Sequence, residues 1–312
     1  MKIAILDDYQ DQVRHLPCFD LLAGHSVEVF NETYDEDTLV EKLKDVEALV
    51  LIRERTAITD TLLARLPQLK VISQTGKVSN HIDPEVCKAH GVEVLEGRGS
   101  PVAPTELGWA LIMAASRHLP AYISAFNQGQ WQQSGERGLG RVLNGLTLGI
   151  WGYGKIGQRM AQISHVFGMK VMVWGSESSR ALAVSHGFMA AESKADFFAT
   201  ADVLSLHLRL NSATKGVVTT EDFAHMKADA LFVNISRAEL VEPGALLAWL
   251  KANPKAQAAL DVYEQEPATP ATEPLLQLPN VVATPHLGYV EQKSYELYFE
   301  IAFKNLVEFA AR

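Results

Sequence analysis

Three glycines in the middle of the chain have the spacing of a dinucleotide-binding turn. The run Leu-Gly-Ile-Trp-Gly-Tyr-Gly-Lys-Ile-Gly ends at Gly157 and places the earlier pair at Gly152 and Gly154. This G-x-G-x-x-G pattern follows a predicted strand and opens a predicted amphipathic helix, which is the context in which it binds a pyrophosphate. Gly152 would permit the tight turn, Gly154 the close approach of the pyrophosphate, and Gly157 close helix–strand packing. We expect the amides of Lys155 and Ile156 to point at the phosphates from the helix N-terminus.

The choice between NAD and NADP stays open at the next predicted strand. In a dinucleotide-binding unit, an acidic residue about 20 positions after the glycines bonds the adenosine ribose hydroxyls. Here Gly175 stands in that place, after Val-Met-Val-Trp. Glu177 could substitute for the missing carboxylate, whereas Ser176, Ser178 and Arg180 could equally hold a 2′-phosphate. We therefore expect NAD as the cofactor and leave NADP open.

Polar residues follow three of the later predicted strands. The segments read Val-Asn-Ile-Ser-Arg237, Ala-Leu-Asp261-Val-Tyr-Glu-Gln-Glu266-Pro and Ala-Thr-Pro-His286-Leu-Gly. In their order and spacing they resemble the D-isomer-specific 2-hydroxyacid dehydrogenase family, which includes D-3-phosphoglycerate dehydrogenase and glyoxylate/hydroxypyruvate reductases. The resemblance extends over essentially the whole chain. Because ligands bind at the carboxyl ends of strands in open α/β sheets, a functional interpretation of all three segments is favoured.

The resemblance implies catalytic roles for Arg237, Glu266 and His286. A 2-oxo acid presents a carboxylate and a carbonyl, and one guanidinium can donate to both with its forked geometry. Reduction places negative charge on the carbonyl oxygen, which a protonated imidazole can neutralise by proton transfer. An anionic Glu266 should favour the charged imidazole and fix the orientation of its ring. The implied activity is hydride transfer between a nicotinamide cofactor and a small D-2-hydroxy acid or its 2-oxo acid.

The resemblance also implies cofactor contacts outside the glycine-rich turn. Asp261 matches a residue at the nicotinamide end, His207 a position beside the adenosine, and Thr105 a contact on the linking helix. Ile235, just before Ser-Arg, completes the expected cofactor set. A satisfied histidine at the end of a strand is an equally good interpretation of His207.

The loop after the strand at Val71 should supply backbone amides to the substrate carboxylate. Family members often carry two glycines there, but this chain reads Thr-Gly-Lys77-Val78-Ser, with Val78 in place of the second glycine. Lys77 brings a cation to the expected edge of the site, and Arg53 could by position reach the far end of the substrate. Exposed surface charges would explain Lys77 and Arg53 equally well, so the size and charge of the substrate stay open.

Short apolar runs alternate with helix-like stretches along the whole chain, as in parallel sheets covered by helices on both faces. A stretch rich in glycine and proline at 96–104 divides the runs into two series, and a long helix is expected to start near Thr105. A second crossover is expected near Pro285. We predict an α/β protein with two doubly wound parallel-sheet domains. A Rossmann dinucleotide-binding domain over 99–286 is inserted in a flavodoxin-like substrate domain made of 1–98 and 287–312. The expected strands are Ile3–Leu6, Leu49–Ile52, Val71–Ser73, Val92–Leu95, Leu146–Trp151, Val171–Trp174, Val203–Leu208, Leu231–Ile235, Ala258–Val262 and Val281–Thr284.

Composition narrows the classes of function. The chain has 312 residues, a net charge of −9 and two cysteines. The acidic balance disfavours a nucleic-acid partner, because such binding relies on clustered Lys and Arg. Cys18 and Cys87 have no metal-ligand spacing, and no apolar run is long enough for a membrane span. We expect a cytoplasmic protein with no metal and no membrane partner, and the resemblance implies a homodimer.

A second class of function is left open. Related proteins of this fold act as NAD(H)-sensing co-repressors whose main output is a protein contact, and they can retain the set Arg237, Glu266 and His286. Relatives that act on formate or phosphite would need additional polar groups beside the histidine, and Thr-Pro-His-Leu-Gly shows none. Turnover of a 2-oxo acid, as opposed to cofactor binding alone, separates the dehydrogenase from the binding protein.

Overall fold

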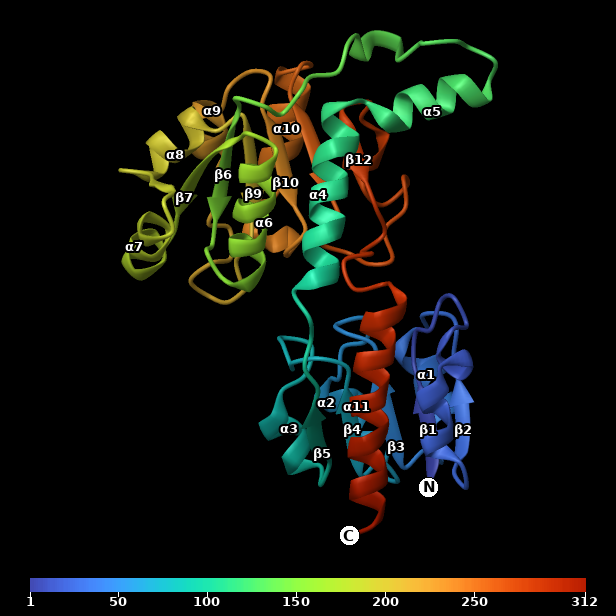
Figure 1. Ribbon diagram of the computed structural model, residues 1–312. Helices are drawn as coiled ribbons and strands as arrows, with labels where there is room; N and C mark the ends of the chain where they lie inside the picture. Colours follow the sequence, from blue (N-terminus) through green and yellow to red (C-terminus); the bar gives the residue numbers. More distant parts are fainter. The chain divides into compact units, whose positions relative to one another are not determined.

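The computed structural model describes residues 1–312, which form two compact units. Unit 1 comprises Met1–Ser100 and Val290–Arg312, and unit 2 comprises Pro101–Tyr289 (Figure 1). Each unit has its own sheet, and every strand pair in both sheets is parallel. The predicted fold class, two α/β units with parallel sheets, is confirmed.

The sheet of unit 1 has the strand order β2-β1-β3-β4-β5, which is the flavodoxin-like order. Its three central strands are almost wholly buried because helices cover both faces. The elements are β1 (Lys2–Ile5), two 3-10 helices (Val13–His15 and Pro17–Leu22), β2 (Ser26–Val29), α1 (Glu36–Leu43), β3 (Ala48–Leu51), α2 (Asp60–Ala64), β4 (Val71–Gln74), α3 (Pro84–Ala89), β5 (Glu93–Glu96) and α11 (Gln292–Ala310).

The last helix, α11, belongs to unit 1 although it follows the whole of unit 2 in sequence. The hydroxyl of Ser73 in β4 donates to the carbonyl of Ala302 in the middle of α11, at 2.9 Å. Phe299, Phe303 and Leu306 of the same helix are almost wholly buried. The C-terminal segment therefore completes the core of the first unit.

The sheet of unit 2 has the order β12-β11-β10-β9-β6-β7-β8, a Rossmann order extended by one strand. Since all its strands are parallel, their carboxyl ends meet at one edge. The elements are α4 (Val102–Ser116), α5 (Leu119–Asn127), a 3-10 helix (Gly135–Arg137), β6 (Thr147–Trp151), α6 (Lys155–Val166), β7 (Lys170–Trp174), α7 (Glu177–Ser185), β8 (Met189–Ala190), α8 (Lys194–Thr200), β9 (Val203–Leu206), α9 (Thr220–His225), β10 (Leu231–Asn234), a 3-10 helix (Ala238–Leu240), α10 (Ala245–Ala252), β11 (Gln257–Leu260), a 3-10 helix (Pro274–Gln277) and β12 (Val281–Ala283).

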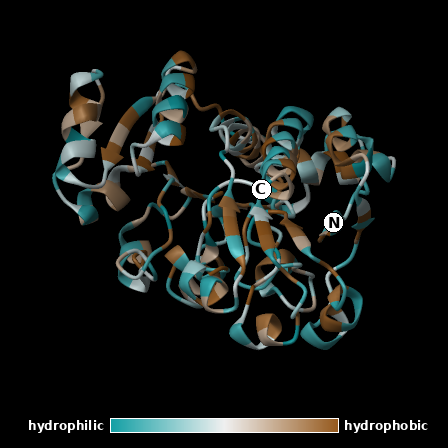
Figure 2. Cartoon of the chain, turned by 90° about the horizontal axis from the view of Figure 1, so that it is seen from below, coloured by the Kyte–Doolittle hydropathy of each residue, from teal (hydrophilic) through white to brown (hydrophobic).

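Hydrophobic residues run along the strands of both units (Figure 2). In unit 2 the two faces of the sheet build separate clusters. Phe232 of β10 packs in one cluster with Phe223 and Trp249, whereas its neighbour Val233 packs in the other with Met160. This two-residue alternation in a strand buried on both faces explains why the strands read as continuous apolar runs. No helix is both long and apolar enough to cross a bilayer.

Two strands and one helix start differ from the sequence prediction. β2 and β8 were not predicted, because both lie at sheet edges and are partly exposed, and β8 has only two residues. The linking helix, α4, begins at Val102 and not near Thr105. Pro104 fits in its first turn because the N–H groups of that turn have no partner within the helix.

Candidate active site

The glycine-rich turn joins β6 to α6, and two of its glycines sit where no side chain fits. Gly152 has φ +100°, and a Cβ there would lie 2.5 Å from the carbonyl oxygen of His207. A Cβ on Gly157 would lie 2.2 Å from the carbonyl oxygen of Gly152. A Cβ on Gly154, in contrast, would meet nothing within 4 Å. The turn is therefore tight on the protein side and open on the other.

The open side of this turn presents the start of α6. Gly154 is the N-cap, and no side chain caps the helix. The amides that follow, those of Lys155 and Ile156, belong to the first turn, where helix N–H groups have no partner within the helix. The helix dipole adds a partial positive charge at this end. Open space, available donors and favourable potential together fit the pyrophosphate of a dinucleotide.

The end of β7 lies beside this turn, because the Gly152 amide donates to the Trp174 carbonyl at 3.1 Å. Gly175 follows with φ +148°, and Ser176 is the N-cap of α7, its hydroxyl accepting from the Ser179 amide. Glu177 is exposed in the first turn of the helix. The strand thus ends without a carboxylate directly after it.

Arg180 lies on the same helix one turn further along. Its guanidinium lies 5.0 Å from the centre of the Trp174 ring and donates to the Ala191 carbonyl at 3.5 Å. Its buried Nε has no hydrogen-bond partner. A cation is therefore fixed close to the end of β7, where the sequence lacks the usual acidic residue.

His207 follows β9 and packs against the glycine-rich turn. Its Nε2 lies 3.0 Å from the Ser205 hydroxyl, whereas its Nδ1 is buried and has no partner. Burial lowers the pKa of His207 to about 4. The ring is therefore neutral near pH 7, with one nitrogen left unpaired at the carboxyl edge of the sheet.

Thr105 and Ile235 are both buried where α4 packs on the sheet. The hydroxyl of Thr105 donates to the Pro101 carbonyl, at 2.6 Å. Gly108 of α4 lies so close to Ile235 that a Cβ would come within 2.9 Å of the Ile235 Cδ1. Ile235 therefore packs against α4 at the end of β10, while the hydroxyl of Thr105 is engaged at the start of its own helix.

Arg237 follows β10 in a turn that a buried amide organises. The side chain of Asn234 donates to the Arg237 carbonyl at 2.8 Å and accepts from the Ser236 amide at 3.0 Å. The Arg237 guanidinium donates to the Ser236 carbonyl. The Ser236 hydroxyl donates to the Leu206 carbonyl and ties the turn to β9. Local hydrogen bonds therefore determine where the arginine leaves the strand.

Glu266 and His286 form a pair. The Nδ1 of His286 lies 2.7 Å from the Glu266 Oε2, and the side chains are 19% and 29% exposed. The other oxygen of Glu266 accepts from the backbone amide of Tyr263 at 3.0 Å. The Tyr289 ring and the imidazole pack in a T-shaped arrangement, with 5.4 Å between the ring centres. With Nδ1 bound to a carboxylate, Nε2 is the nitrogen left for proton exchange.

The three residues share one edge of one sheet. Arg237 follows β10, Glu266 follows β11 and His286 follows β12, and these strands are neighbours in the order β12-β11-β10. The glycine-rich turn follows β6 at the same carboxyl edge. Topology therefore gathers the predicted catalytic residues and the dinucleotide turn on the side of unit 2 where open α/β sheets bind ligands.

Comparison with known proteins agrees with this arrangement. Residues 109–288 match the model of the family described as "D-isomer specific 2-hydroxyacid dehydrogenase, NAD binding domain". The glyoxylate reductase of Aeropyrum pernix is 34% identical over 281 residues, which cover 88% of this chain and 83% of that protein. This chain belongs to the D-isomer specific 2-hydroxyacid dehydrogenase family. The resemblance predicted from the sequence is confirmed.

Other members of the family differ in length. The D-3-phosphoglycerate dehydrogenase of Methanocaldococcus jannaschii is 34% identical over 254 residues, which cover 81% of this chain but 48% of that protein. This chain thus spans about half the length of that relative. A crystal structure titled phosphoglycerate oxidoreductase, from Vibrio cholerae O395, is 66% identical with a TM-score of 0.99 and covers 100% of this chain and 99% of that chain.

Membership of the family identifies the cofactor as NAD(H), since the matched model is that of an NAD-binding domain. The geometry of the glycine-rich turn fits it. The named relatives are dehydrogenases and reductases, which does not favour the alternative of a co-repressor-like binding protein. No group of three or more His, Cys, Asp or Glu side chains is arranged to hold a metal ion.

In unit 1, Arg53 is held at the end of β3 by the loop after β4. Its backbone has φ +54°, its amide donates to the Thr75 hydroxyl, and its guanidinium donates to the Thr75 carbonyl at 3.3 Å. The same guanidinium lies 3.6 Å from the Glu54 carboxylate. A Cβ on Gly76 would come within 2.0 Å of its Nη1. The guanidinium therefore lies directly against the glycine.

Lys77 and Val78 both bind Glu96 at the end of β5. The ammonium of Lys77 lies 2.6 Å from one Glu96 oxygen, and the Val78 amide donates to the other at 2.8 Å. The ammonium of Lys77 lowers the pKa of Glu96, so this carboxylate stays ionised. Both the charge of Lys77 and the amide of Val78 are thus already engaged within unit 1.

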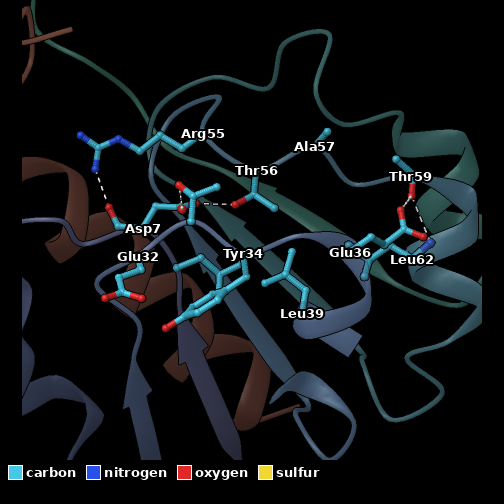
Figure 3. A pocket seen from close by; sticks show the side chains of 12 residues that line it. Asp7, Glu32, Tyr34, Glu36, Leu39, Arg55, Thr56, Ala57, Thr59 and Leu62 are labelled. Carbon is cyan, nitrogen blue, oxygen red and sulfur yellow. Dashed lines mark hydrogen bonds between the residues drawn. The ribbon is translucent and has the colours of Figure 1, made fainter. Parts of the chain in front are cut away.

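Unit 1 also has a small pocket at the carboxyl ends of β1 and β3, with a volume of about 210 Å³ (Figure 3). Asp7 lies at one side of it with φ +61°, and its carboxylate accepts from the hydroxyls of Thr33 and Thr56. Arg55 donates to the Asp7 carbonyl at 2.6 Å. These hydrogen bonds within unit 1 define the wall of the pocket.

Sequence reasoning missed three residues that shape these sites. Asn234 is a polar residue at the end of an otherwise apolar strand, a signal that could have been noticed. Tyr263 and Glu96 gave no such signal, because their partners, Thr284 and the loop at 77–78, are distant in sequence. Only the folded chain shows that they hold predicted site residues in place.

Proposed function

We propose that the protein is an NAD-dependent dehydrogenase that interconverts a small D-2-hydroxy acid and its 2-oxo acid. In this proposal the domain made of 99–286 supplies the cofactor-binding and acid–base groups, and the domain made of 1–98 and 287–312 supplies the substrate side. The observation that carries the proposal is the hydrogen bond between His286 and Glu266 at the edge of the sheet that also bears Arg237. The activities named for the relatives support it.

Arg237 binds the substrate in this proposal. Its guanidinium donates to the carboxylate and to the 2-oxo oxygen, which fixes the carbonyl for attack and polarises it. The bound nicotinamide supplies or accepts the hydride. The Asn234 contacts keep the backbone of the arginine turn in one conformation, so little ordering is needed when substrate binds.

His286 moves the proton. During reduction its Nε2 gives a proton to the 2-oxo oxygen as a C–H bond forms at the carbonyl carbon, and during oxidation it takes the hydroxyl proton back. Glu266 accepts from Nδ1, which selects the ring orientation and leaves Nε2 as the nitrogen that exchanges the proton. The proton balance is closed because one proton and one hydride enter each 2-oxo acid that is reduced.

In the cofactor pocket we propose contacts from Gly152, Gly154, Gly157 and the amides of Lys155 and Ile156 to the pyrophosphate. We place Gly175, Ser176, Glu177 and His207 at the adenosine end. Thr105, Ile235 and Asp261 are placed at the nicotinamide end. The buried unpaired Nδ1 of His207 and the open space at Gly154 support this assignment.

On the substrate side we propose that the loop with Lys77 and Val78 lies at the substrate carboxylate and that Arg53 lies near the far end of the substrate. Arg53 and Lys77 are already paired with Glu54 and Glu96. Such pairs reduce the net positive charge available to a second anionic group and favour a small, singly charged 2-oxo acid.

The test is a reduction screen of purified protein with NADH and with NADPH. The panel contains glyoxylate, hydroxypyruvate, pyruvate and a phosphorylated 2-oxo acid, and turnover is followed by loss of the reduced-nicotinamide absorbance. Arg237→Ala should abolish turnover of every active substrate, while Arg65→Ala, at an exposed ion pair with Asp37, should retain it. Retention of full activity by Arg237→Ala would refute the assignment.

We propose further that the protein is a homodimer joined through unit 2. Large apolar side chains are exposed on α5 and the segment that leads from it to β6, including Phe126 (61%), Trp131 (73%), Leu139 (92%) and Val142 (70%). Figure 1 shows this stretch extending away from the rest of unit 2. Apolar patches of this kind mark interaction surfaces, and a second copy of the chain is the partner proposed.

A cytoplasmic location is supported by the two free cysteines.

A further inference from the structure

The loop that carries His286 has an uncommon backbone conformation. His286 has φ +51°, in the left-handed region that residues other than glycine seldom adopt. Such a conformation persists where the surroundings determine it, and it aims the side chain in a direction that an extended loop would not give. The groups that hold this loop therefore determine where the imidazole points.

Asp261 anchors the loop that carries His286. The residue is fully buried. One oxygen accepts from the Thr284 hydroxyl at 2.6 Å and the Leu287 amide at 2.7 Å. The other accepts from the Gly288 amide at 2.9 Å. The residues on both sides of His286 are therefore fixed to one buried group.

Tyr263 binds Glu266 directly and is connected to His286 through the backbone of Thr284. Its backbone amide donates to the Glu266 Oε1 at 3.0 Å. Its phenol donates to the Thr284 carbonyl at 2.9 Å, and that carbonyl also accepts from the His286 amide at 3.0 Å. A closed circuit results, running from Tyr263 to Glu266, to His286, to Thr284 and back to Tyr263.

The phenol of Tyr263 is suited to this role. The residue is only 8% exposed. Burial raises the pKa of the phenol, and the nearby carboxylates of Asp261 and Glu266 raise it further. The phenol is therefore protonated near neutral pH and acts there as a hydrogen-bond donor.

We propose that Tyr263 is a positioning residue, which sets the geometry between His286 and Glu266 through its phenol–Thr284 hydrogen bond. The proposal rests on the proposed function in taking that pair as the acid–base machinery. The hydrogen bonds between Asp261 and Thr284, Leu287 and Gly288 also fix this geometry, because they anchor the loop on both sides of His286. Tyr263 itself touches neither substrate nor cofactor in this scheme.

Tyr263→Phe is the decisive variant, because it keeps the ring and the amide that binds Glu266 and removes only the phenolic donor. We expect kcat to fall about tenfold, while KM for the 2-oxo acid and Kd for NADH stay within about twofold. Tyr122→Phe is the matched control. It also removes a phenol that donates to a backbone carbonyl, that of Gly138, outside the site, and it should leave kcat unchanged.

A double-mutant cycle separates positioning from general damage. In a Glu266→Ala background the pair no longer exists, so adding Tyr263→Phe should lower kcat by less than about twofold. An equal loss in both backgrounds would overturn the proposal. If Tyr263→Phe does not fold, Tyr263→Leu replaces it in the cycle, since it also removes the phenolic donor and keeps the backbone amide that binds Glu266.

A spectroscopic readout needs no turnover and so is independent of the proposed function. The Nδ1–H proton of His286, bound to a carboxylate, should give a low-field proton NMR signal that disappears in His286→Asn. In Tyr263→Phe this signal should move upfield or broaden, and in Tyr122→Phe it should not. An unchanged signal in folded Tyr263→Phe would overturn the proposal even if the enzyme were active.

Discussion

His286 and Glu266 are 20 residues apart in sequence, yet the imidazole Nδ1 lies 2.7 Å from the carboxylate Oε2. The contact forms because β11 and β12 are neighbouring parallel strands, so the segments that follow them leave the sheet at the same edge. A histidine held in this way has one nitrogen committed to orientation and the other left for chemistry. The predictions that follow begin from this pair.

Replacing His286 should remove proton transfer and spare cofactor binding. We expect His286→Gln to lower kcat by roughly 10²- to 10⁴-fold, with the Kd for NADH, measured by fluorescence titration, nearly unchanged. His90→Gln is a suitable control, since that histidine also lies beside a carboxylate, with its Nε2 2.8 Å from Asp60 in unit 1. Equal losses in the two variants would argue against a catalytic role.

Alanine substitutions at Gly157 and Gly154 of the glycine-rich turn should have different effects on stability. Gly157→Ala puts a Cβ 2.2 Å from a backbone oxygen, so we expect a lower melting temperature as well as weaker NADH binding. Gly154→Ala meets no protein atom within 4 Å. It should keep the melting temperature of the apo protein and lose only the thermal shift that NADH provides. Similar apo stability in both variants would contradict this view of the turn.

The end of β7 should discriminate weakly against NADPH. Gly175 offers no carboxylate to repel a 2′-phosphate, and the Arg180 guanidinium is fixed nearby. Ser176→Asp adds the missing charge and retains an N-cap, because aspartate caps helices as well as serine does. We expect this variant to lower kcat/KM with NADPH relative to NADH by about tenfold. An unchanged ratio would show that the 2′-position lies elsewhere.

The exposed apolar stretch after α4 should hold two copies together. Trp131→Asp or Phe126→Asp places a charge in a patch whose side chains are mostly exposed in the single chain. Light scattering coupled to gel filtration should show a dimer for the wild type and a monomer for either variant. Exposed Val184 on α7 (58%) provides the control, since Val184→Asp should leave the assembly intact.

Acidification should destabilise the protein through His207. Burial lowers the pKa of this residue from 6.5 to about 4, so the unfolded chain binds the proton first as the pH falls. The contribution is complete above pH 6.5 and is lost as the pH falls towards 4, with up to about 3 kcal/mol involved. The free energy of unfolding, measured with urea between pH 6.5 and pH 4, should fall less steeply with decreasing pH for His207→Asn than for wild type.

The sequence was enough to predict features that follow from local patterns, but not features that depend on contacts between residues distant in the chain. Buried central strands such as β3 and β10 were evident from unbroken apolar runs, because helices cover both of their faces. Edge strand β2 was not, because half of its residues face solvent. Phe167 directly follows α6 and is 41% exposed, whereas Gly157, Met160, Ala161 and Ser164 form the buried face of that helix.

The candidate site shows the same division. Residue types and order were enough to select Arg237, Glu266 and His286, because each follows a recognisable strand. The partners that hold them were not predictable in this way. Tyr263 acts through a hydrogen bond to a carbonyl 21 residues later. Lys77 forms an ion pair with Glu96, and the two residues are close only because β4 pairs with β5.

The contact between Gly76 and Arg53 has a consequence for how such chains can change over time. A side chain at position 76 would occupy the space of the guanidinium, which there donates to the Thr75 carbonyl. The end of the arginine can move aside, but the backbone sets a stricter limit, because Gly76 has φ +90°, a conformation that L side chains rarely adopt. Position 76 should therefore remain glycine among descendants of this sequence, whatever residue stands at 53.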